Sequence, residues 1–148
     1  MRNAAVRLAL TVAVILSFPA SQTAQQTTFV VILNKANPVK SLTLVELRRI
    51  FFKQTRMWPH GEAIVPVEWD ATSPLRAEFS QLVMERSVRD MADFWVQQSI
   101  TQGLAPPSTQ RLSRALRRFV ASVPGAIAYI PVGDVDDTVS AIAVARPR

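Results

Sequence analysis

Short apolar runs without helical spacing predict four β-strands. Residues 29–33 are aromatic and β-branched, and they end at the turn-forming Asn34, Asn37 and Pro38, which predicts a buried central strand. Residues 139–144 alternate between apolar and small or polar side chains, so we expect a strand at an exposed edge of the sheet. The other two predicted strands are 64–69 and 126–130.

Between these strands, apolar residues recur at helical spacing and predict four amphipathic helices. They run from Ser41 or Thr43 through Phe51, from Ser73 through Met84, from a capping-box-like Ser87 to near Gly103, and from Leu112 until Pro124-Gly125. The resulting order, β-α-β-α-α-α-β-β, predicts an α/β fold built as a three-layer sandwich.

The N-terminus has the layout of a secretory signal peptide. Arg2 and Arg7 precede the apolar stretch 8–18, and small and polar residues follow. The stretch is far shorter than the roughly 20 residues of a membrane-spanning helix, which leaves an uncleaved anchor as the weaker alternative. We therefore expect a signal over residues 1–24, with cleavage after Ala20 or Ala24, and one domain over 25–148 that is periplasmic or secreted.

Composition narrows the function classes. The chain has no cysteine, which excludes disulfides, thiol catalysis and a lipid-anchored lipoprotein start. The net charge of +6 falls to +4 without Arg2 and Arg7 of the predicted signal, which is ordinary for a soluble surface, so we expect no nucleic-acid partner.

Catalytic and metal-binding patterns are weak. His60 is the only histidine and lies in a Trp-Pro-His-Gly turn. The acidic cluster 134–137 lacks the spaced ligands and the glycine of a calcium loop. Glu68 and Asp70 lack a third group that would complete a carboxylate-based active site. We expect no enzyme, metal or cofactor, with an extracytoplasmic hydrolase as the weakest alternative. The arginines at 111, 114 and 118 predict a solvated helix face.

The Ser73 turn is the candidate ligand site. Ser73 is a favoured N-cap and Pro74 suits the first helical position, so the unpaired backbone N–H groups of the first turn should attract an anion. Arg76 in that turn opposes the helix dipole unless a negative group lies nearby. The alternative is that Asp70 and Glu68 neutralise Arg76 in a surface ion pair, without any ligand.

Several segments, in this order, resemble the periplasmic phosphate-binding proteins, which are type II solute-binding proteins of ABC transporters. They are 34–38, the helix 44–53 followed by Trp58-Pro59-x-Gly61, the strand 64–67, the Ser73 turn with Phe79, and Val123-Pro124-Gly125-Ala126-Ile127-Ala128-Tyr129-Ile130. The most specific of these segments is the strand start Pro-Gly-Ala-Ile-x-Tyr. The resemblance covers nearly the whole mature chain but implies only one lobe of a type II periplasmic-binding-protein-like fold.

The chain departs from the family at the ligand loop, which usually reads Arg-x-Asp-Gly-Ser-Gly-Thr. Only Ser73 carries over; the family arginine, aspartate, second glycine and threonine fall on Trp69, Ala71, Pro74 and Leu75.

The resemblance nevertheless implies weak binding of phosphate or a related small oxyanion through Ser73, Thr72 and Arg76, linked to phosphate ABC transport. The alternative is that the lobe has lost its ligand and serves as an interaction module for an envelope protein or as a homodimer.

Overall fold

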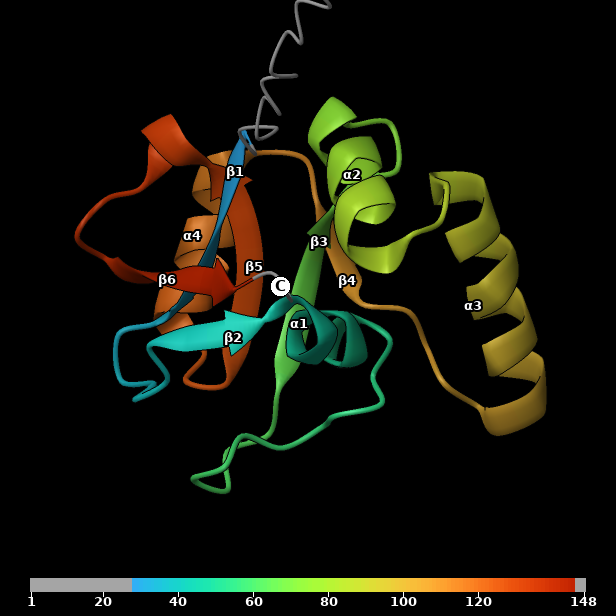
Figure 1. The fold of residues 1–148 in the computed structure, drawn as a ribbon, viewed down its shortest axis with the longest axis horizontal. Helices are drawn as coiled ribbons and strands as arrows, with labels where there is room; N and C mark the ends of the chain where they lie inside the picture. The colour runs from blue at the N-terminus through green and yellow to red at the C-terminus, as the bar shows by residue number, and fades with distance from the viewer. Residues whose placement is uncertain (1–27, 146–148) are drawn as a thin grey trace, which may run out of the picture.

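The structure, a computed structural model, describes residues 28–145 and contains one mixed six-stranded sheet with the strand order β2-β6-β1-β5-β3-β4 (Figure 1). The predicted signal peptide, 1–24, lies outside the described residues. The elements are β1 Phe29–Asn34, β2 Ser41–Thr43, α1 Leu44–Phe51, β3 Val65–Trp69, α2 Pro74–Phe79, the π-helix η1 Ser80–Met84, α3 Val88–Gln102, β4 Ser108–Gln110, α4 Ser113–Ser122, β5 Ala126–Pro131, the 3-10 helix η2 Val132–Asp134 and β6 Val139–Ala145.

The sheet is antiparallel at its centre and parallel at its flanks. β1 pairs antiparallel with both β5 and β6, whereas β3 runs parallel to its neighbours β5 and β4. The prediction that 139–144 is an edge strand is wrong, because Ser41–Thr43 forms β2 and pairs with the end of β6. Both β2 and β4 have only three residues, too few for a hydrophobic pattern to predict a strand.

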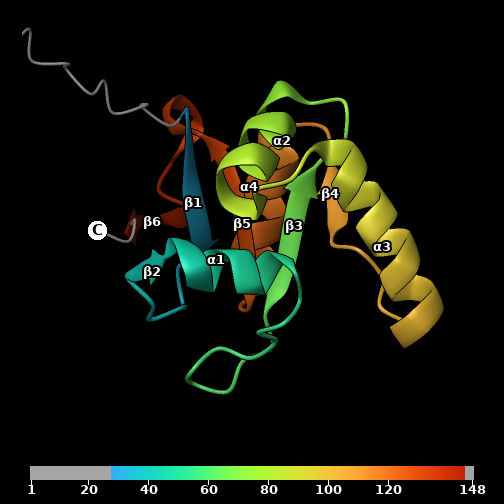
Figure 2. The same cartoon turned by 45° about the vertical axis from the view of Figure 1, so that its right-hand side comes forward.

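Helices cover both faces of the sheet, which confirms the three-layer sandwich. α1, the continuous α2–η1 segment and α3 lie on one face, and α4 lies alone on the other (Figures 1 and 2). Alternate residues of β1 divide between two cores: Val31 and Leu33 pack with Phe51, whereas Ile32 packs with Leu116 of α4. This alternation follows from the two-residue period of a strand.

Helix starts and ends follow the predicted chemistry. Thr43 caps α1 through a capping box with Glu46, and Ser87 caps α3 through a capping box with Asp90. α3 ends at Gly103 in the left-handed conformation, with φ of 66°, which glycine adopts without steric cost. In the described part of the chain, no helix is long and apolar enough to cross a membrane.

Candidate functional site

The Ser73 turn joins β3 to α2 and is held by its own hydrogen bonds. The backbone N–H and the Oγ1 of Thr72 donate to Asp70 Oδ1 at 3.1 and 2.7 Å, and the N–H of Ser73 donates to the Asp70 carbonyl at 3.0 Å. The two bonds from Thr72 hold the pKa of the Asp70 carboxyl below its usual range. Ser73 stands at the N-cap position, as predicted, but its side chain makes no capping hydrogen bond.

Arg76 lies inside the protein rather than beside the turn. Its Nη1 donates to Glu68 Oε2, and the two side chains are only 8% and 3% exposed. The structure therefore brings Ser73 and Thr72 together at the surface and directs the Arg76 charge to Glu68. The sequence had raised neutralisation by Glu68 as the alternative, but as a surface pair; the pair is buried. Asp70 instead lies 3.6 Å from the exposed Arg111, measured from Oδ2 to Nε.

Burial dominates the electrostatics around Glu68. It raises the pKa of this carboxyl to about 7, although Arg76 and Lys53 act in the opposite direction. Burial also lowers the pKa of Lys53, whose Nζ donates to the carbonyl oxygens of Ala105 at 2.9 Å and Pro106 at 3.4 Å. Burial and the nearby Glu68 raise the pKa of Tyr129. Glu68 and Arg76 thus form a buried pair near the end of β3, and Lys53 is close enough to lower the pKa of Glu68.

Trp69 has a structural role at the position where the family arginine falls. The β3–β5 ladder pairs only Val65 and Pro66 with β5. Beyond it, the Trp69 indole Nε1 donates to the Tyr129 carbonyl at 2.8 Å. The Trp69 side chain therefore ties β3 to β5 beyond the end of their ladder.

Next to the turn, a groove of about 540 Å³ lies between α3 and the strands β3 and β4. Glu68 and Arg76 lie among its lining residues, but most of the lining is apolar. This groove was not predicted from the sequence. One available signal was that Val96 and Ile100 interrupt the polar face of α3; they are 61% and 80% exposed. The lining residues are Glu68, Ala71, Arg76, Val88, Ala92, Trp95, Val96, Ser99, Ile100, Pro106, Pro107 and Thr109.

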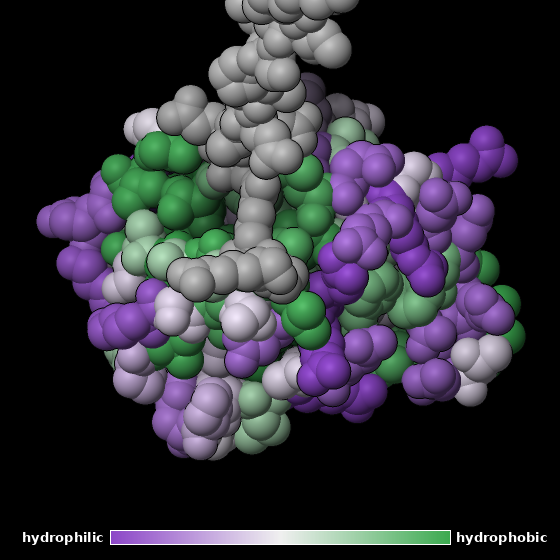
Figure 3. Space-filling model, in the orientation of Figure 1, coloured by the Kyte–Doolittle hydropathy of each residue, from purple (hydrophilic) through white to green (hydrophobic). Residues whose placement is uncertain are grey.

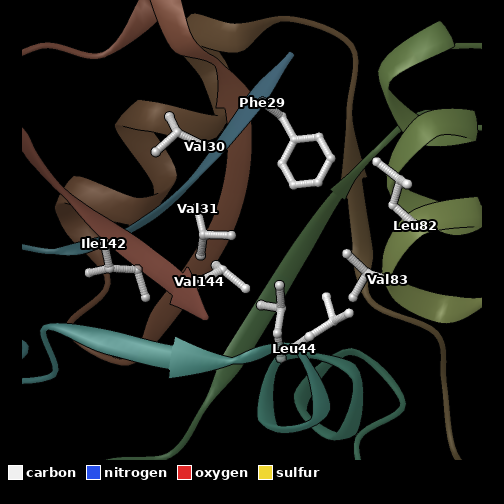
Figure 4. A pocket seen from close by; sticks show the side chains of 9 residues that line it. Phe29, Val30, Val31, Leu44, Leu82, Val83, Ile142 and Val144 are labelled. Carbon is white, nitrogen blue, oxygen red and sulfur yellow. The ribbon is translucent and has the colours of Figure 1, made fainter. Parts of the chain in front are cut away.

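A second pocket, of about 350 Å³, is lined only by apolar residues (Figure 4). Phe29 and Val31 of β1 face Leu82 and Val83 of η1 across it, and Leu44 of α1 closes one side. Hydrophobic surface gathers over the β1 and β6 side of the molecule, whereas the surface over α2 and α3 is mostly hydrophilic (Figure 3).

The other candidate groups have structural surroundings. Asp136 accepts from Thr138 and lies 3.0 Å from Arg117, which also donates to the Asp134 carbonyl. Within residues 28–145, no group of three acidic, histidine or cysteine side chains is arranged to hold a metal ion. His60 lies in an exposed turn against Trp58, with ring centroids 6.5 Å apart.

The fold is similar to solved phosphate-transport receptors. An ABC-type phosphate transport receptor from Vibrio cholerae matches with 25% identity and a TM-score of 0.64, over 79% of this chain and 46% of the receptor. A protein of Clostridium perfringens, assigned to the phosphate ABC transporter substrate-binding proteins and solved with bound phosphate, matches with 29% identity and a TM-score of 0.63, over 79% of this chain and 44% of its own.

At 11% identity, PstS from Borrelia burgdorferi shares the fold, with a TM-score of 0.62 over 79% of this chain and 47% of that one. This chain therefore spans less than half the length of these structures, as expected for one lobe. No protein-family model matches the sequence, and no curated protein matches it.

Proposed function

We propose that this chain is an exported solute-binding-like protein that binds phosphate or a related small oxyanion weakly. The proposal is supported by the fold, which is that of one lobe of the phosphate-binding proteins of ABC transporters. The proposed site is the Ser73 turn, with the Ser73 hydroxyl and the first backbone N–H groups of α2 as donors. Thr72 also belongs to the site, but its hydroxyl donates to Asp70 Oδ1 and must leave that carboxylate before it can donate to a ligand. Arg76 contributes through its N–H in that turn. The proposal includes a periplasmic or secreted location and no catalytic activity.

The observation that carries the proposal is the Ser73 side chain, which stands at a helix start without capping it. Its hydroxyl therefore remains available to a ligand, next to the N–H groups that lack partners within the helix. One of the similar structures has bound phosphate. The sequence resemblance places Ser73 on the serine of the family's phosphate loop, which supports the same site.

The charges at the turn favour weak binding. Glu68 holds the Arg76 guanidinium inside the protein, and the Asp70 carboxylate lies beside the turn, where it repels an anion. Arg111 offsets Asp70 only in part, because it is 84% exposed and its attraction is screened by water. An anion on one open lobe also keeps part of its hydration, which weakens its charge-assisted hydrogen bonds.

Thermal unfolding in phosphate, sulfate and chloride at matched ionic strength tests this proposal. We expect phosphate and sulfate to raise the melting temperature above its value in chloride, since a ligand that binds only the folded state stabilises it. The Ser73→Ala variant should lose this gain, and Ser122→Ala, at an exposed serine of α4, should keep it. Equal melting temperatures in all three salts would contradict the proposal.

A link to phosphate transport follows only if a second lobe joins this one, because this chain spans less than half of the similar receptors. In that case the two lobes would close on the anion and exclude water. Adding a second solute-binding lobe should then tighten phosphate binding; unchanged affinity would remove the transport part of the proposal.

The second candidate function is an interaction module that forms a homodimer. The apolar pocket between β1, β6, α1 and η1 favours it, because a lobe without a ligand gains most by burying such surface (Figure 4). Light scattering over a range of concentrations should then show a dimer, and Leu44→Glu, which adds a charge at the pocket wall, should give the monomer. A monomeric wild-type chain would exclude this candidate.

A further inference from the structure

A third pocket, of about 530 Å³, lies at the carboxyl ends of β3 and β5. The two strands are parallel, so their last residues, Trp69 and Pro131, lie at the same edge of the sheet. β1 is antiparallel to β5, and its first residue, Phe29, pairs with Pro131, which brings the start of β1 to this edge as well. In open α/β sheets, ligands bind outside the carboxyl ends of the strands. The lining residues are Thr28, Trp69, Ser73, Pro74, Leu75, Glu78 and Pro131.

The helix α2 supplies one wall of this pocket. Pro74 and Glu78 both line it, because residues four positions apart lie on the same face of a helix. Arg76 and Phe79 belong to the opposite face and are buried in the protein. The helix therefore directs the Arg76 charge to the interior and the Glu78 charge to the pocket.

The charge of the pocket is negative. Among the described residues that line it, Glu78 is the only charged one. Its carboxylate accepts hydrogen bonds from the Thr28 N–H, at 3.0 Å, and from the Thr28 hydroxyl, and both donors are neutral. Within residues 28–145, no basic side chain forms an ion pair with Glu78. A carboxylate without a cationic partner, in surroundings that hold no other charge, favours a positively charged ligand.

Trp69 adds an aromatic wall to the same pocket. Its indole is half-buried, and the hydrogen bond from Nε1 to the Tyr129 carbonyl, at 2.8 Å, holds the ring in place. Tryptophan is the aromatic side chain that attracts cations most strongly. A side chain that is already held loses little freedom when a ligand binds. Trp69 and Glu78 thus provide two groups that attract a cation, on two walls of one pocket.

The remaining walls select the kind of cation. Pro74, Leu75 and Pro131 are apolar, so a metal ion would lose its hydration there without gaining the oxygen ligands that it needs. An alkylated ammonium group presents its charge on a surface of methyl groups, which contact apolar walls and aromatic rings favourably. The lining therefore fits an organic cation rather than an inorganic one.

We propose that this pocket binds a small organic cation with an alkylated ammonium group. The ammonium lies between the Glu78 carboxylate and the Trp69 indole, and its alkyl groups contact the apolar walls. Ser73 belongs both to this pocket and to the proposed oxyanion site. The cation depends on Glu78 and Trp69, whereas the oxyanion depends on the Ser73 hydroxyl and backbone N–H groups, so neither proposal rests on the other.

The test is an NMR titration of the full chain with choline, a trimethylammonium alcohol, followed at the Trp69 indole N–H and the Glu78 backbone amide. The neutral alcohol in which carbon replaces the ammonium nitrogen controls for the charge, and sodium chloride at equal concentration controls for ionic strength. We expect saturable shifts with choline at millimolar concentration, binding of the neutral alcohol that is weaker by about tenfold or more, and no shift in sodium chloride.

A pair of acid-to-amide variants tests the charge. Glu78→Gln keeps an acceptor oxygen for Thr28 and removes the negative charge, so it should weaken choline binding about tenfold. Asp93→Asn makes the same change at an exposed acid of α3, outside the pocket, and should leave choline binding unchanged. Both positions are exposed or half-buried, so the variants should fold.

A second pair of variants tests the aromatic wall. Trp69→Phe and Trp69→Leu both remove the hydrogen bond to the Tyr129 carbonyl, but only the first keeps an aromatic ring. Choline should therefore bind Trp69→Phe more tightly than Trp69→Leu, as measured at the Glu78 amide. Equal affinities of the two variants would contradict the role of the ring.

Three results would overturn the proposal: no saturable shift at Trp69 and Glu78 with choline, equal binding of choline and its neutral analogue, or undiminished binding in Glu78→Gln. Phosphate enters none of these measurements, so failure of the cation site leaves the oxyanion proposal standing. Phosphate shifts at Leu75 and Arg76, or their absence, bear on the oxyanion proposal alone.

Discussion

Arg76 donates to Glu68 in an ion pair, and both side chains are almost completely buried. The strand β3 presents Glu68 to the face covered by α2, and eight residues later the first turn of α2 returns Arg76 to it. The cation that the sequence predicts for an anion at the Ser73 turn, Arg76, is therefore held by a carboxylate. This relationship explains why a lobe with the fold of a phosphate receptor should bind oxyanions only weakly.

Removing one partner of the pair should lower the stability of the fold far more than replacing both partners. Arg76→Met leaves Glu68 buried without its cation, and we expect a loss of about 3–5 kcal/mol in the free energy of unfolding. The double variant Glu68→Leu/Arg76→Met removes both charges and should recover most of that loss. Urea denaturation measures both, and a single variant as stable as wild type would contradict the buried pair.

Stability should fall as the pH rises towards neutrality. Burial raises the pKa of Glu68 from an ordinary 4.5 to about 7, so between these values the folded state binds more protons than the unfolded chain. The contribution is complete below 4.5 and is lost as the pH rises through about 7. We expect a decrease of the order of 3 kcal/mol across this window.

Denaturation at a series of pH values measures this slope, with Glu68→Gln as the variant that lacks the titrating group. Asp70 and Asp90 have lowered pKa values, so they titrate below the window and leave the slope unchanged. An identical slope in wild type and Glu68→Gln would assign the pH dependence to another group.

Gly125 is required by a close backbone approach rather than by its dihedral angles. A Cβ at this position would lie 1.8 Å from the carbonyl oxygen of Ala63. Gly125→Ala should therefore force the two segments apart and cost about 1–3 kcal/mol or more, since neither backbone can move freely. Gly133→Ala, with open space around the position, should stay within about 0.5 kcal/mol of wild type.

The sequence predicted the elements that have strong local signals. Thr43, Ser87 and Gly103 begin or end helices because their side chains or their conformational freedom fit those positions, and the buried strands have long apolar runs. β2 and β4 escaped prediction because three-residue strands are fixed by their partners, β6 and β3. Tertiary pairing, rather than local pattern, decides such segments.

The candidate site was predictable in outline only. Ser73 and Thr72 lie at the turn as expected, since cap chemistry is local. The direction of the Arg76 side chain depends on whether Glu68 faces the core, which the sequence left open. The sequence-based alternative of an ion pair at the surface was wrong about burial, because both side chains are buried. The groove could not be predicted, because it depends on the packing distance between α3 and β4, which no residue pattern specifies.

The oxyanion proposal is tested most directly by titrating phosphate into the full chain and following the backbone amides of Leu75 and Arg76 by NMR, with those of Ser87 to Asp90 at the start of α3 as the reference. The account predicts saturable shifts at Leu75 and Arg76 with a millimolar midpoint and none at the reference. Unmoved Leu75 and Arg76 amides at saturating phosphate, or equal shifts at both helix starts, would contradict it.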